Sequence, residues 1–200
     1  MKALQIRQLL LISILLLSIS GVNVQDDPAL SPRVGHKMVV DSGNDQVILF
    51  GGNSLSEAQV FYDDTWIYSP ESNIWTQLMI DGPSPRGSHA LAYNPDDGTV
   101  LLFGGQTPTR RLSETWVFDC TTETWIEIET ETSPEGRSDF GMVCDSSRGV
   151  FILYGGWSGR SGLRDDTWVF DPKANTWSEI EIDVTPGRMY GQNLEFDPVG

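Results

Sequence analysis

The sequence predicts an all-β protein made of repeated four-stranded units. An apolar run that ends in a Gly-Gly pair occurs three times, as VILFGG at 47–52, VLLFGG at 100–105 and FILYGG at 151–156. Two tryptophans nine residues apart follow each pair, at 66 and 75, 116 and 125, and 168 and 177. Nothing in these units has a helical period. Landmarks that recur together about every 50 residues are typical of a repeat architecture.

Each unit contains the same elements in the same order. The first strand is expected at 36–40, 89–93 and 140–144, and a turn rich in Asn, Asp, Gly and Pro follows it. The second strand is the continuous apolar run, which is typical of a strand buried on both faces. The third contains a Thr-Trp dipeptide, and the fourth alternates apolar with acidic residues, as in WIEIE. Such alternation indicates an outer strand with one face in water.

Four antiparallel strands repeated in this way predict the blades of a β-propeller. We expect an incomplete propeller over 31–200, with three four-stranded antiparallel blades plus the first strand of a fourth. The repeats are expected at about 31–80, 84–130 and 134–182, with a truncated one at 186–200. Because ring closure removes exposed strand edges, we expect a fragment of a longer protein, and assembly of a ring from several chains is the alternative.

Glycines and arginines recur once per unit at fixed places. Glycine reaches positive φ and lets neighbouring backbone approach closely, so the glycine pairs are predicted to be structural. These glycines are Gly51, Gly52, Gly104, Gly105, Gly155 and Gly156. The repeats start with an arginine, and recurrence in every blade favours packing and hydrogen bonding between blades over ligand binding. These repeat-start arginines are Arg33, Arg86, Arg137 and Arg188.

The combined landmarks resemble Kelch repeats. The resemblance is carried by the aromatic-Gly-Gly pair, the tryptophan pair, the turn in FDPKANTW at 170–177 and the Arg/His repeat start, and it covers about 31–200. It implies a Kelch-type β-propeller, in the superfamily that includes the central domain of galactose oxidase.

The loops between second and third strands are long and variable, at 53–64, 106–114 and 157–166. In an up-and-down blade they share one face with the connections between blades, and variable loops on a rigid frame commonly carry recognition. An exposed tryptophan there could stack on a sugar or peptide, or could cap a blade edge. Loop arginines could bind an acidic partner, or could offset nearby acids. The candidate ligand-binding residues are Arg110, Arg111, Trp157, Arg160 and Arg164.

The composition limits the chemistry that the chain can perform. A net charge of −15 disfavours nucleic acid as a partner. The two histidines, His36 and His89, occupy the first-strand position that is Phe140 in the third unit, so we interpret both as packed side chains. With two cysteines besides, no metal site, cofactor or catalytic set is predicted. Cys120 and Cys144 could pair in an oxidising compartment.

The first 20 residues have the layout of a secretory signal peptide. Lys2 and Arg7 precede an apolar run over 9–19, and Ser18 and Ser20 suit cleavage after residue 20. We therefore expect a signal peptide at 1–20, a linker at 21–30, an extracellular or cell-surface location, and no membrane insertion after signal removal. An uncleaved N-terminal membrane anchor is the alternative.

Three functions fit these observations. The favoured one is an exported Kelch propeller that acts as a binding or scaffold module for a protein or glycan, through its 2–3 and 4–1 loops. The second is a copper enzyme similar to galactose oxidase, whose catalytic residues would lie in missing blades. The third is a structural adhesive module of a larger surface protein. The sequence favours a non-enzyme because no catalytic constellation is visible in it.

Overall fold

The computed structural model describes residues 30–197. Every described strand belongs to the unit Ser31–Gly200. The predicted signal peptide, and the predicted linker up to residue 29, lie outside the described residues. Within residues 30–197 there is no helix long and apolar enough to cross a lipid bilayer.

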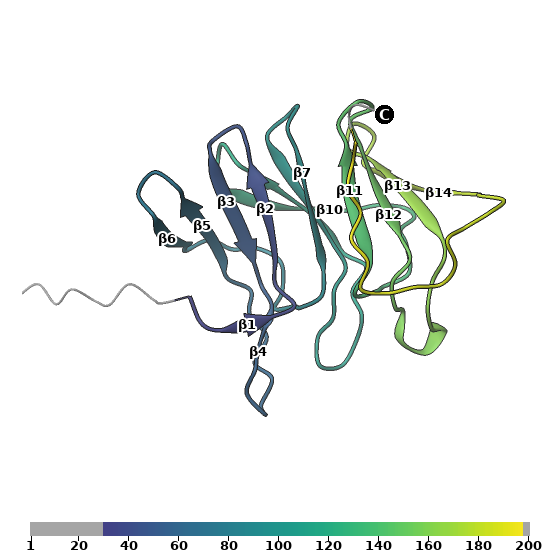
Figure 1. The fold of residues 1–200 in the computed structure, drawn as a ribbon, viewed down its shortest axis with the longest axis horizontal. Coiled ribbons are helices and arrows are strands. Elements are labelled where there is room, and N and C mark those ends of the chain that lie inside the picture. The colour runs from purple at the N-terminus through teal and green to yellow at the C-terminus, as the bar shows by residue number, and fades with distance from the viewer. Residues whose placement is uncertain (1–29, 198–200) are drawn as a thin grey trace, which may run out of the picture. The chain divides into compact units, whose positions relative to one another are not determined.

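Three four-stranded antiparallel sheets form the blades, each a simple meander in chain order (Figure 1). Blade 1 contains β2 (Lys37–Asp41), β3 (Gln46–Phe50), β5 (Thr65–Ser69) and β6 (Ile74–Leu78). Blade 2 contains β7 (Ala90–Asn94), β8 (Thr99–Phe103), β9 (Thr115–Asp119) and β10 (Thr124–Ile128). Blade 3 contains β11 (Gly141–Asp145), β12 (Val150–Tyr154), β13 (Thr167–Asp171) and β14 (Thr176–Ile180). The predicted three-bladed, all-β fold is confirmed.

Smaller elements lie in the loops. A two-stranded sheet pairs β1 (Arg33–Val34) with β4 (Asn53–Ser54), and a 3-10 turn, η1, spans Gly159–Ser161. Both belong to the face of the long 2–3 loops, at the bottom of Figure 1. Their two or three residues carry no periodic pattern, so the sequence did not predict them.

Inner strands β2, β7 and β11 lie side by side in that order, and apolar side chains fill the space between blades. Alternate residues of β8 pack against opposite neighbouring blades. Leu102 packs in the cluster with Ile48 and Phe50 of blade 1, whereas Phe103 packs with Phe151 and other residues of blade 3. This two-sided burial explains why the second strand of each repeat is apolar throughout.

The recurring Thr-Trp dipeptide and the second tryptophan join neighbouring blades. Trp125 Nε1 of blade 2 donates a hydrogen bond of 2.9 Å to Thr65 Oγ1 of blade 1. Trp177 Nε1 of blade 3 donates one of 3.0 Å to Thr115 Oγ1 of blade 2. Buried indole N–H groups need an acceptor, and the threonine before the third-strand tryptophan provides it.

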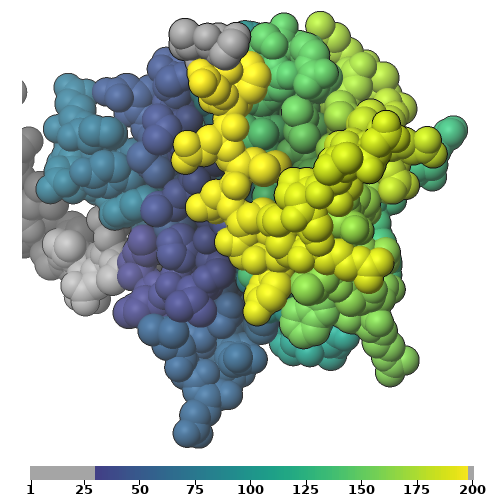
Figure 2. Space-filling model, turned by 45° about the vertical axis from the view of Figure 1, so that its right-hand side comes forward, coloured from purple at the N-terminus to yellow at the C-terminus, as the bar shows by residue number. Residues whose placement is uncertain are grey.

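Residues 186–197 lie where the fourth blade's first strand was predicted, but they form no strand. They run along β11, and Gln192 Nε2 donates to the Tyr154 carbonyl at 2.7 Å (Figure 1). Gln192–Glu195 and blade 1 residues such as Lys37 line one pocket of about 210 Å³, and Figure 2 shows the segment in yellow beside the purple strands. An inner strand is held by the second strand of its own blade, which no described residue supplies here.

Matched glycine substitutions test the predicted role of the Gly-Gly pair. Gly104 has φ +64°, and a Cβ there would lie 2.8 Å from the Arg137 carbonyl oxygen. Gly98 has φ +68° with open space around it. A left-handed backbone costs an alanine roughly 1–2 kcal/mol, so Gly98→Ala should lose that much and Gly104→Ala at least about 1 kcal/mol more. Urea unfolding measures both losses, and equal losses would contradict a packing role for Gly104.

Candidate binding face

Three of the four repeat-start arginines are buried in the same arrangement, which we call the arginine lock. Arg137 Nη1 donates to the Gly155 carbonyl at 2.9 Å, and its two Nη atoms bind the Asp166 carboxylate at 2.6 and 2.8 Å. Arg33 binds the Gly51 carbonyl and Asp64 in the same way. The lock therefore ties the start of a blade to its own glycine pair and to the loop before its third strand.

The backbone of the lock reaches the preceding blade. The Arg86 carbonyl accepts a hydrogen bond from Gly52 N–H at 2.8 Å, and the Arg137 carbonyl accepts one from Gly105 N–H at 2.9 Å. In the last repeat Met189, one residue later than Arg188, accepts the equivalent bond from Gly156. The Arg188 side chain is 69% exposed and lies 3.7 Å from Asp165. The described residues contain no glycine pair or loop carboxylate of its own blade, so the structural role of Arg188 stays a prediction.

The lock carboxylate also binds the third-strand tryptophan when it is an aspartate. Trp66 Nε1 donates to Asp64 Oδ2 at 2.7 Å, and Trp168 Nε1 donates to Asp166 Oδ2 at 2.9 Å. In blade 2 the carboxylate belongs to a glutamate, Glu114, which binds Arg86 and Arg110. Trp116 Nε1 is buried there without a hydrogen-bond partner.

Ionisation of the lock carboxylate stabilises the fold. Burial acts to raise the pKa of Asp166, but the hydrogen bonds and charge of Arg137 outweigh it, and the pKa is lowered overall. A lowered pKa in the folded state means that the stabilisation is present above about pH 4 and is lost as the pH falls through the folded-state pKa. The lock of blade 3 should therefore hold throughout the neutral and mildly acidic range.

A cleft of about 700 Å³ opens between the 2–3 loops of blades 2 and 3, and we call it the loop cleft. Four of the five candidate binding residues line it: Arg110, Arg111, Trp157 and Arg160. Glu135 and Gly136, from the connection between the two blades, complete its wall. Residues about 50 positions apart in the sequence thus meet at one place because equivalent loops of neighbouring blades are adjacent in space.

Two of the cleft side chains, Arg111 and Trp157, pack against each other. The Arg111 guanidinium lies over the Trp157 ring, 4.4 Å from its centroid, and Trp157 Nε1 donates to the Gly159 carbonyl at 2.9 Å. The indole still exposes 42% of its surface. Trp157 therefore packs at the junction of two loops and leaves part of its surface exposed, and its role in ligand binding stays a prediction.

The guanidinium of Arg164, the fifth candidate, is already paired with an acidic side chain. It forms an ion pair with Glu135, which also accepts a 2.6 Å hydrogen bond from Ser161 Oγ. Arg110 is 66% exposed and only loosely paired with Glu114, at 3.3 Å. The acid that pairs with Arg164 belongs to the connection between blades, about 30 positions away in the sequence.

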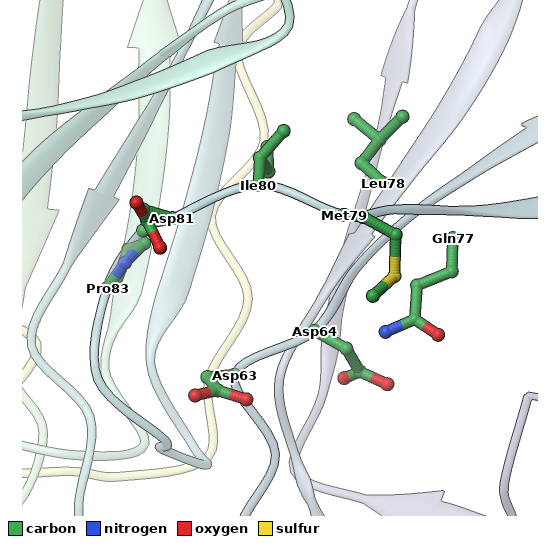
Figure 3. Close-up of a pocket in the computed structure, with 9 residues that line it drawn as sticks. Asp63, Asp64, Gln77, Leu78, Met79, Ile80, Asp81 and Pro83 are labelled. Atoms are coloured by element: carbon green, nitrogen blue, oxygen red, sulfur yellow. The ribbon is translucent and has the colours of Figure 1, made fainter.

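A second pocket recurs in equivalent positions of two blades. In blade 1 it measures about 500 Å³ and lies between Asp63, Asp64 and the segment that follows β6 (Figure 3). In blade 3 a pocket of about 300 Å³ lies between Asp165, Asp166 and the segment that follows β14. Because it repeats with the blade, this hollow belongs to the blade geometry and does not distinguish a dedicated site.

The cysteines are both free and buried. Burial is the main cause that raises the pKa of Cys120 to about 12 and that of Cys144 to about 11, with nearby aspartates adding to it. Both groups are therefore neutral thiols at pH 7. Among residues 30–197, no group of three or more His, Cys, Asp or Glu side chains could hold a metal ion.

Meandering four-stranded blades with recurrent buried locks define a repeat β-propeller. The chain belongs to the Kelch-repeat family, because residues 5–193 match the family model described as the KLHDC2/KLHL20/DRC7 Kelch-repeats domain. Kelch-repeat domains generally act as protein-interaction or scaffold modules.

Curated relatives share the repeats at moderate identity. The chain is 29% identical over 173 residues to human Multiple epidermal growth factor-like domains protein 8, a match that covers 82% of this chain and 6% of that protein. It is 33% identical over 159 residues to the Dynein alpha chain, flagellar outer arm, of Chlamydomonas reinhardtii, covering 74% of this chain and 3% of that protein. The matching region is thus a small part of each relative.

Swapping aspartate and glutamate at the lock position tests whether the length of the acidic side chain decides which groups it binds. Glu114→Asp should let blade 2 adopt the arrangement of the other blades, and pairing the buried Trp116 N–H should raise the free energy of unfolding by about 1 kcal/mol. The reverse change, Asp166→Glu, should leave Trp168 without its acceptor and cost about 1–3 kcal/mol. Urea unfolding measures both. Destabilisation by Glu114→Asp together with a neutral Asp166→Glu would contradict this account.

Proposed function

We propose that this chain is the binding module of an exported protein, and that it holds a protein or glycan ligand on the face of its 2–3 loops and 4–1 connections. The observation that supports this most is the loop cleft, where two neighbouring blades bring Arg110, Arg111, Trp157 and Arg160 together. The proposed export rests on the signal-peptide layout of residues 1–20.

The charge of the cleft indicates what would bind there. Arg110, Arg111 and Arg160 face the cleft, and its acid, Glu135, is already paired with Arg164. A positive cleft in a protein of net charge −15 favours an acidic segment of a ligand. Guanidinium groups bind carboxylates through charge-assisted, paired hydrogen bonds, and the exposed Trp157 ring adds a surface for stacking.

Charge reversal at the exposed cleft arginines tests this proposal. Peptides from a randomised library and glycans from an array are selected on the wild-type chain, and their affinity is then measured for Arg110→Glu/Arg160→Glu. We expect at least a tenfold loss, because each lost charge-assisted contact is worth about 1 kcal/mol or more.

The control carries the same charge change on the opposite face. Arg148→Glu/Lys173→Glu alters two exposed residues in the short turns, far from the 2–3 loops in the blade. Selected ligands should bind this variant as they bind the wild type. Ligands that tolerate the cleft variant, or a failure of the wild-type chain to select any ligand, would contradict the proposal.

A further inference from the structure

His89 is an unpartnered imidazole in the packed contact between blades 1 and 2. It lies just before β7, is 1% exposed, and meets the Phe50 ring edge-on, with centroids 5.4 Å apart and planes at 77°. A Cβ added at Gly51 of blade 1 would lie 3.3 Å from His89 Cε1, which shows how closely the backbone approaches. Neither ring nitrogen has a hydrogen-bond partner.

The titratable groups that act electrostatically on this ring are all basic, so none of them favours its protonated form. They are Arg86, Lys37 and His36, and the charge of Arg86 is itself paired with Glu114. A protonated His89 would be a buried cation without an acceptor, which is strongly unfavourable. Burial first, and the nearby cations second, hold the pKa of His89 well below its ordinary value.

The contact between blades 2 and 3 has the same ring geometry, but its side chain at the equivalent position cannot be protonated. Phe140 takes the place of His89, is 2% exposed, and meets Phe103 edge-on, with centroids 5.7 Å apart and planes at 73°. A Cβ added at Gly104 would lie 3.1 Å from Phe140 Cε1, close to the 3.3 Å between a Cβ at Gly51 and His89 Cε1. The two contacts therefore form a natural matched pair within one chain.

We propose that His89 makes the contact between blades 1 and 2 a pH-sensitive joint, which opens more often in mildly acidic conditions, whereas the contact sealed by Phe140 opens no more often than at neutral pH. This inference does not depend on a ligand in the loop cleft, which lies between blades 2 and 3. Its consequence would be that acid loosens blade 1 and leaves the walls of the cleft in place.

The direction follows from proton linkage. When the joint opens, the imidazole meets water and binds a proton with its ordinary pKa near 6.5, whereas the closed state keeps it neutral. Stability of the joint is therefore full above about pH 6.5 and falls as the pH falls below it. The equilibrium constant for opening should rise roughly 25-fold between pH 7 and pH 5, while the lock carboxylate Asp166, with its lowered pKa, stays ionised.

Backbone amides that bridge the two contacts report on opening separately. Gly52 N–H and Ser88 N–H donate to Arg86 and Gly35 across the first contact. Gly105 N–H and Asp139 N–H donate to Arg137 and Ser88 across the second. Hydrogen exchange of the full chain at pH 7 and pH 5, corrected for intrinsic rates, should show the 25-fold rise for the first pair of amides alone.

Three variants assign the effect to the residue. His89→Phe should abolish the rise, Phe140→His should create one at the second contact, and His36→Gln should behave as the wild type. If His89→Phe does not fold, Phe140→His decides the matter. An equal rise at both contacts of the wild type, no rise at either, persistence of the rise in His89→Phe, or a Phe140→His chain without a new rise would overturn the proposal.

Discussion

The buried guanidinium at the start of each of the three complete repeats is the constraint on which the arrangement of the blades depends. Its side chain holds three separate segments of one blade together, because it donates to a glycine carbonyl and to a carboxylate in the following loop. Its own carbonyl accepts a hydrogen bond from the preceding blade. An arginine suits this task because its planar fork offers several donors in fixed directions, which a lysine does not. The positive φ of Gly51, Gly104 and Gly155 belongs to the same arrangement.

This frame explains where recognition can develop. Each lock fixes both ends of a 2–3 loop, because its carboxylate ends the loop and its glycine pair begins it. Between these ends the loop is free to vary, and the side chains of neighbouring loops meet over the boundary between blades. Arg111 and Trp157 stack across one such boundary. A rigid frame with variable loops can therefore change its ligand without changing its fold.

The sequence predicted the features that depend on local pattern. Strand order, blade number and the face of the long loops follow from the recurrence of glycine, tryptophan and apolar runs, and the first strands were placed one residue too early. The sequence could not predict which acid pairs with which arginine, because Glu135 lies near Arg164 only after two blades have packed. The sequence also could not predict that Gly156 N–H would bind the carbonyl of Met189 and not that of Arg188. Arg188 keeps the spacing of the repeat-start arginines, but the backbone there is displaced by one residue.

Replacement of Arg137 by lysine tests the central role of the lock most directly. Lysine keeps the positive charge but cannot reach the Gly155 carbonyl and both Asp166 oxygens together, so the free energy of unfolding in urea should fall by about 2–4 kcal/mol. Arg188→Lys, at the exposed repeat start, is the matched control and should change it by less than about 0.5 kcal/mol. An Arg137→Lys chain as stable as the wild type would show that charge alone suffices, and that the fork geometry does not hold the blades.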